Sequence, residues 1–207
     1  TKSTPLHLAA EGGFSECVSV LLSKGAKSEA RNSKGQTALH LASRVLSLDC
    51  VEILLEEGRC NPNILDCDKR SALHSAVGKA LNSSDITELL IQKGADVNQS
   101  DIYGYTPLHV AAINKNIACV EILIKKGANL ILKTNGGNTA LGIIIRRIPY
   151  VLPVFYKKLD DAITISDPEI SSAKEVTMKL DFRIFLQHSQ NQELDFLKTF
   201  LDEGQKE

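Results

Sequence analysis

A four-residue motif that returns about every 34 residues constrains the fold of this chain more than any other feature. It reads Thr-Pro-Leu-His, Thr-Ala-Leu-His, Ser-Ala-Leu-His, Thr-Pro-Leu-His and, altered, Thr-Ala-Leu-Gly, starting at residues 4, 37, 71, 106 and 139. The steps between these starts are 33, 34, 35 and 33 residues. Periods of about 20 to 50 residues are typical of stacked units that cannot bury their apolar faces without a neighbour. The sequence therefore predicts a solenoid built from about five units.

Each motif is followed by the same local pattern, which predicts two helices and a polar hairpin. Thr106 is placed to cap a first helix, and Pro107 suits the first turn of that helix. Gly94 and Gly127 follow second helices, at positions where a left-handed residue ends a helix. Two units carry insertions, around 80–84 between the two helices and near 59–63 after the second helix. Both insertions fall in loops, where extra residues are tolerated.

The sequence of these units resembles the ankyrin repeat. The family pattern is T-P-L-H-x-A-A, a second helix, then G-A-D-V-N and D-x-x-G, and residues 94–109 read GADVNQSDIYGYTPLH. The resemblance covers residues 1 to about 145. It implies a mostly α fold, an ankyrin-repeat solenoid of helix-turn-helix-hairpin units.

Beyond residue 145 the pattern changes. The fifth unit has glycine where the others have histidine, and residues 146–163 are predicted to form a divergent capping unit. Residues 164–207 are predicted to form a small C-terminal α+β linker region. Within it, residues 176–185 alternate apolar and polar as a half-buried strand does, and residues 193–201 form a short amphipathic helix.

Composition and charge exclude several classes of protein. The formal net charge is −1, from 24 basic and 25 acidic residues, so no global field draws the chain to nucleic acid or anionic lipid. No apolar run approaches the ~18 residues that a spanning helix needs. Five cysteines without a secretory leader favour reduced thiols in the cytosol, with disulfides as the weaker alternative. We also expect the chain, which opens abruptly at Thr1, to be a fragment of a longer protein.

The histidines and cysteines are interpreted mainly as structural. His7, His40, His74 and His109 share one register, too far apart for common metal ligation, and are expected to hydrogen-bond between adjacent units. Three cysteines that precede valines are expected to be small packing residues, namely Cys17, Cys50 and Cys119. Cys60 and Cys67 lie in hairpin regions nearer to solvent, which leaves a pair of reactive thiols or plain loop positions as alternatives. Nucleotide-binding loops and catalytic motifs are missing, so no enzyme activity, cofactor or metal is predicted.

A protein-binding surface is the remaining candidate site. In ankyrin-like stacks the hairpin tips and the exposed side of the first helix form a concave face. Tyr103 and Tyr105 are its best candidate anchors, since tyrosine gives large contact area at low entropic cost. The alternative is that both rings shield their hairpin. The other candidates carried over by register are Lys34, Arg70, Lys79, Ile102, Ile113 and Asn114. Asn98 resembles the asparagine that is hydroxylated in ankyrin domains, with a hairpin hydrogen bond as the favoured alternative.

Two functions remain open. Residues 148–152, 159–163 and 179–184 resemble the segment that links the repeats to the first membrane helix in transient receptor potential ankyrin-type cation channels, nearest to the painless-like branch. This resemblance implies a homotetrameric, calcium-permeable, non-selective cation channel of sensory cells. The fragment would then lie on the cytoplasmic side of the plasma membrane, with the membrane crossed by segments absent from this chain. The alternative is a soluble ankyrin adaptor that binds another protein through its concave face.

Overall fold

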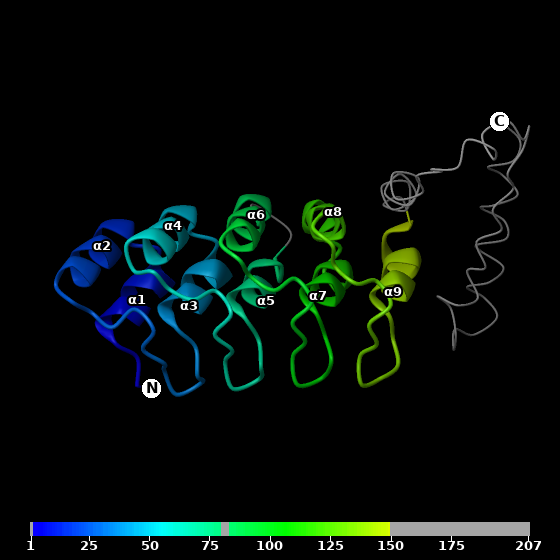
Figure 1. Ribbon diagram of the computed structural model, residues 1–207, viewed down its shortest axis with the longest axis horizontal. Coiled ribbons are helices and arrows are strands. Elements are labelled where there is room, and N and C mark those ends of the chain that lie inside the picture. Colours follow the sequence, from blue (N-terminus) through cyan, green and yellow to red (C-terminus); the bar gives the residue numbers. More distant parts are fainter. Residues whose placement is uncertain (1, 80–82, 150–207) are drawn as a thin grey trace, which may run out of the picture.

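The computed structural model describes residues 2–79 and 83–149, which form a row of helix pairs (Figure 1). The first two pairs are α1 (Pro5–Gly12) with α2 (Ser15–Ser23) and α3 (Ala38–Val45) with α4 (Leu48–Glu56). The next two are α5 (Ala72–Ala76) with α6 (Ser84–Gln92) and α7 (Pro107–Ile113) with α8 (Ile117–Lys125). The helix α9 (Ala140–Arg147) opens the fifth unit and runs across the predicted boundary at residue 145. The strand predicted at 176–185 and the helix predicted at 193–201 lie outside the described residues.

The helices form two layers, and this arrangement confirms the predicted mostly α solenoid. Figure 1 shows α1, α3, α5, α7 and α9 side by side in one row, which we call the inner helices. The helices α2, α4, α6 and α8 form a second row, the outer helices, and hairpin loops project on the opposite side of the inner helices. We call these hairpins fingers. The inner helices therefore lie between the fingers and the outer helices.

A reciprocal cap fixes where each of the first four inner helices begins. At the start of α7 the Thr106 hydroxyl caps the backbone of His109, and the Thr106 backbone N–H donates to Nδ1 of His109 at 3.2 Å. The same capping box is present at Thr4, Thr37 and Ser71. Such a box satisfies two backbone donors that a helix start leaves free. The predicted cap and the proline in the first turn are both confirmed.

The core runs along the whole stack. The leucine of each motif is almost completely buried, and the residues are Leu6, Leu39, Leu73, Leu108 and Leu141. Burying one such side chain contributes about 1.5–3 kcal/mol relative to leaving it exposed. Alanines one turn later, such as Ala42 and Ala111, are inaccessible to solvent and let the inner helices lie close to their neighbours.

The outer helices α6 and α8 end at left-handed glycines, as the sequence predicts. Gly94 and Gly127 have φ values of 89° and 91°, in the left-handed region. In the second unit, by contrast, Arg59 takes the left-handed conformation with a φ of 48°. The backbone of Cys60 then bonds back to Leu54, six residues earlier, whereas Ala95 bonds back to Leu90, five residues earlier. The extra residue predicted near 59–63 is accommodated by this wider turn.

Hydrogen bonds hold the fingers in register. Within one finger, Oδ1 of Asp101 accepts from the backbone N–H groups of Tyr103 and Tyr105, both at 2.9 Å. Between fingers, Ile102 N–H donates to the Asp68 carbonyl at 3.0 Å. Equivalent bonds join Cys67 to Lys34 at 3.0 Å and Asn135 to Tyr103 at 2.9 Å. These bonds fix the backbone positions of the candidate binding residues.

Candidate protein-binding surface

Histidines join successive units, as predicted. Nε2 of His7 lies 2.9 Å from the carbonyl oxygen of Gln36 in the next finger. His40 makes the same bond to the Arg70 carbonyl, and His74 to the Tyr105 carbonyl, both at 3.0 Å. Because Nδ1 accepts from the N-cap backbone N–H in each unit, Nε2 is the ring nitrogen that donates to the carbonyl. Burial lowers the pKa of His40 and His74 and so keeps both rings neutral.

The fourth histidine departs from this pattern. His109 is completely buried, yet its Nε2 has no hydrogen-bond partner among the described residues. Burial lowers its pKa, although the carbonyls of Asn138 and Leu132 favour the charged ring. Neither carbonyl completes a bond to Nε2. The predicted joint is therefore confirmed for His7, His40 and His74 but not for His109.

The two tyrosines have different environments. The side chain of Tyr103 projects from the tip of its finger and is 55% exposed, beside Ile102 at 39%. Tyr105 is half-buried, and its ring meets the ring of His109 edge to face with centroids 6.1 Å apart. Tyr103 with Ile102 therefore forms an exposed apolar tip, whereas Tyr105 helps to cover the inner helix beneath it. The role of either tyrosine in binding stays a prediction.

The remaining candidates of the concave face are mostly accessible. Lys34, Lys79 and Asn114 are exposed, and Ile113 is half-buried. Arg70 instead pairs with the buried carboxylate of Asp101, with Nε 3.2 Å from Oδ2. This ion pair joins two neighbouring fingers, so Arg70 has a structural contact in addition to any contact with a partner.

The cysteine predictions need two corrections. Cys60 does not lie near solvent: it is 6% exposed, and burial raises its pKa to about 11. A thiol with such a pKa is rarely a thiolate at neutral pH, which disfavours reactivity. Cys67 is exposed, as expected. Cys50 and Cys119 are buried packing residues, whereas Cys17 is exposed and is not.

Asn98 has a defined structural contact. Its side-chain oxygen accepts a hydrogen bond from the backbone N–H of Asn129 at 2.7 Å, in the next unit. In the preceding unit, Asn63 makes the equivalent bond to Asp96 at 2.8 Å. The asparagine thus links two hairpin bases, and its hydroxylation stays a prediction.

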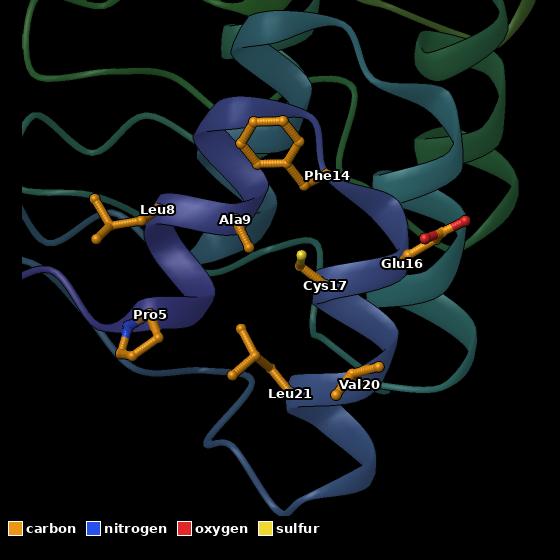
Figure 2. Close-up of a pocket in the computed structure, with 8 residues that line it drawn as sticks. All are labelled: Pro5, Leu8, Ala9, Phe14, Glu16, Cys17, Val20 and Leu21. Carbon is orange, nitrogen blue, oxygen red and sulfur yellow. The ribbon is translucent and has the colours of Figure 1, made fainter.

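Sequence reasoning missed an apolar groove at the N-terminal end of the stack. Figure 2 shows it between α1 and α2, and its volume is about 530 Å³. Leu8, Phe14 and Val20, which line it, are about 60% exposed. Leu41, one repeat after Leu8, is 2% exposed because the first unit covers it. The repeat register could have revealed the groove, because the first unit has apolar residues at positions that a neighbouring unit covers in the second.

These helix pairs, joined by buried histidines and hydrogen-bonded fingers, define a helical repeat solenoid. A family described as "Ankyrin repeats (3 copies)" matches residues 1–66 and 47–134. The chain belongs to the ankyrin-repeat family.

Relatives with and without channel names share these repeats. The chain is 41% identical over 99 residues to the transient receptor potential channel pyrexia of Drosophila melanogaster, which is 47% of this chain and 10% of that protein. It is 31% identical over 125 residues to the human transient receptor potential cation channel subfamily A member 1, 60% of this chain and 11% of that protein. It is 33% identical over 144 residues to the mouse B-cell lymphoma 3 protein homolog, 68% of this chain and 32% of that protein.

The chain thus spans a tenth to a third of the length of these relatives. Across residues 2–79 and 83–149, no helix is long and apolar enough to cross a membrane. The same residues contain no cluster of three or more side chains that could hold a metal ion.

Proposed function

We propose that this chain is the ankyrin-repeat segment of a transient receptor potential ankyrin-type cation channel. The observation that carries the proposal is the 41% identity over 99 residues to the channel pyrexia. The similarity to the human subfamily A channel over 125 residues supports the same class. In this role the chain acts by binding and mechanical coupling rather than by catalysis. It contributes to the assembly and gating of a homotetrameric, calcium-permeable channel in sensory detection.

The structure of the stack suits a gating arm. Each unit contacts its neighbours through one layer of inner helices, one layer of outer helices and a few polar joints. A solenoid with nearest-neighbour contacts bends or opens locally without unfolding as a whole. The proposal places residues 1–145 as the repeats, 146–163 as a capping unit and 164–207 as the linker towards the membrane, on the cytoplasmic side of the plasma membrane.

A soluble adaptor is the second candidate function. It is favoured by the mouse B-cell lymphoma 3 protein homolog, which matches 68% of this chain, more than either channel does. In that case the fingers and inner helices bind another protein, and no membrane segment is involved.

The first test is to read the transcript beyond the codon of Glu207. Several apolar runs of about 20 residues are expected if the chain belongs to a channel. A stop codon or another domain without such runs would overturn the channel proposal and leave the adaptor.

The second test is a current measurement on the full-length product. Expression in cells is expected to give a cation current that Leu73→Ala reduces by loosening the stack, because Leu73 is completely buried. Lys24→Gln, at an exposed position after α2, is the matched control and should leave the current unchanged. A full-length product that reaches the plasma membrane without conducting cations would contradict the proposal.

A further inference from the structure

The two helical layers carry opposite charge. The inner helices and the turns that follow them, residues 5–13, 38–46, 72–79, 107–115 and 140–147, contain five basic residues and one acidic residue. The outer helices and their C-caps, residues 15–24, 48–57, 84–93 and 117–126, contain four basic and eight acidic residues. The net charges are thus +4 and −4 within a chain whose total is −1. The layer with the positive net charge is the one that Figure 1 shows next to the fingers.

The basic residues of the inner layer gather at the C-terminal ends of the inner helices. Arg44, Lys79, Lys115 and Arg147 lie at or just after the C-terminal ends of α3, α5, α7 and α9, so that each of four successive units contributes at least one. We call these four residues the basic row. The fifth basic residue, Arg146, directly precedes Arg147 in α9. Such positions at helix C-termini favour cations, because the carbonyl ends of the helix dipoles are negative.

Two members of the row are available for a partner. Arg44 is paired with Glu11 at 2.6 Å, and Nη1 of Arg147 donates to the Ile113 carbonyl at 3.1 Å. Lys79 and Lys115 are exposed and form no ion pair within the part of the chain that the structure describes. The centre of the row therefore presents ammonium groups without a carboxylate of their own.

The spacing of the row specifies the shape of an anionic partner. Packed helices lie about 8–10 Å apart, so successive units, each with its member of the row, follow one another at roughly that distance along the stack. A polyproline II segment rises about 3.1 Å per residue and completes a turn every three residues. Carboxylates at every third residue of such a segment lie on one side, about 9 Å apart. This matches one carboxylate to each unit.

We propose that the inner surface binds an extended acidic protein segment with Asp or Glu at every third position, laid along the basic row. The exposed tip formed by Ile102 and Tyr103 lies on the finger that leads into α7, the helix that Lys115 follows, and would supply an apolar contact to the same segment. The proposed partner assumes that the stack binds a protein, and to that extent the inference rests on the proposed function.

The charge pattern favours a protein segment over a membrane or a nucleic acid. The anionic outer helices oppose approach to any large polyanionic surface, whereas a single narrow segment meets the basic row alone. Four cations spaced by a helix diameter also differ from the dense basic patch that binding to phosphates at every nucleotide requires.

Fluorescence anisotropy with two synthetic peptides tests the proposal on the whole chain. The probe is a labelled peptide of four Glu-Pro-Pro repeats, and the control peptide has the same composition with its four glutamates consecutive. We expect the periodic peptide to bind at least fivefold more tightly at low salt and to weaken as salt is raised. Equal affinity for the two peptides would overturn the proposed spacing of carboxylates at every third residue. No binding of the periodic peptide would overturn the proposal as a whole.

Two double variants locate the site. Lys79→Glu with Lys115→Glu is expected to weaken the periodic peptide by about tenfold, since reversing two rim charges costs roughly 1.4 kcal/mol. Lys93→Glu with Lys125→Glu on the outer helices makes the same change in net charge and is expected to weaken it less than twofold. Circular dichroism melting of both variants verifies that they fold.

The remaining outcomes identify a different ligand class or separate the two proposals. Equal losses in the two double variants would show that binding follows net charge alone and would overturn the site. Tighter binding to vesicles with one quarter phosphatidylserine, or to single-stranded oligonucleotide, would overturn the choice of a protein segment. Failure of the peptide experiment together with a cation current from the full-length product would reject this inference and keep the proposed channel function.

Discussion

The junctions between the first four units differ from the junction between the fourth and fifth, although the same motif opens all of them. Three junctions are closed by a histidine Nε2 that bonds to a finger carbonyl at 2.9–3.0 Å. At the fourth, Nε2 of His109 is buried without a partner among the described residues. The histidine of the motif therefore does not determine the joint by itself, because the next unit must supply a carbonyl in the right place.

The fifth unit differs from the others where it meets the fourth. Ile144 stands one turn after the motif, where the earlier units have small alanines such as Ala42 and Ala111, and it is 1% exposed. A bulkier side chain at a helix contact increases the distance between the helices. The finger that leads into α9 begins with Thr134, whose hydroxyl accepts one backbone bond at 3.2 Å. In the finger that leads into α7, Asp101 accepts two such bonds.

Cavity variants test whether the fourth junction differs in packing or only in hydrogen bonding. Leu73 and Leu108 occupy the same position in successive units, and both are completely buried. Replacing either by alanine is expected to cost about 2–5 kcal/mol of unfolding free energy. Urea unfolding followed by circular dichroism measures both. If Leu108→Ala proves much less costly than Leu73→Ala, the fourth junction is loosely packed throughout and the comparison extends beyond the histidine.

Histidine variants test the hydrogen bond directly. His74→Leu leaves the Tyr105 carbonyl without its donor and the Ser71 backbone N–H without its acceptor. A buried group left without a partner costs about 1–3 kcal/mol, so we expect a loss in that range. His109→Leu removes the cap contact alone and is expected to cost about 1 kcal/mol less than His74→Leu. Equal losses in urea unfolding would mean that His109 also closes its joint in solution.

The sequence predicted the parts of this molecule that depend on local patterns. The capping role of Thr106 and the left-handed glycines at 94 and 127 follow from rules that act within one turn of the chain. Whether Nε2 of His109 has a partner, and whether Cys60 is buried, depends on contacts with backbone groups about 30 residues away, such as the carbonyls of Asn138 and Ser28. For the candidate surface, register placed Tyr103 and Tyr105 on one finger but did not distinguish the exposed ring from the half-buried one.

The pH dependence of stability tests the buried histidines of the junctions through the protons that they bind. Burial lowers the pKa of His40, His74 and His109 below the usual 6.5, so the unfolded chain binds more protons than the folded chain in this range. Their stabilisation is present above pH 6.5 and is lost as the pH falls from 6.5 towards their folded pKa values. Urea unfolding at pH 7.5 and 5.5 should show lower stability at pH 5.5. His74→Leu is expected to make that dependence shallower, and an unchanged slope would exclude His74 from it.

The smallest expected effect comes from the glycine that replaces histidine in the fifth unit. Gly142 lies inside α9, where its backbone is helical and where alanine is favoured by about 0.5–1 kcal/mol. An added Cβ would lie 3.2 Å from Oγ1 of Thr139, which is close. The earlier units hold a histidine Cβ next to the same kind of cap, so the contact is tolerated in this fold. Gly142→Ala is therefore expected to raise the melting temperature by a few degrees. A lower melting temperature would mean that the cap of α9 is tighter than its counterparts, and that the fifth unit departs from the repeat in its helix start as well as in its joint.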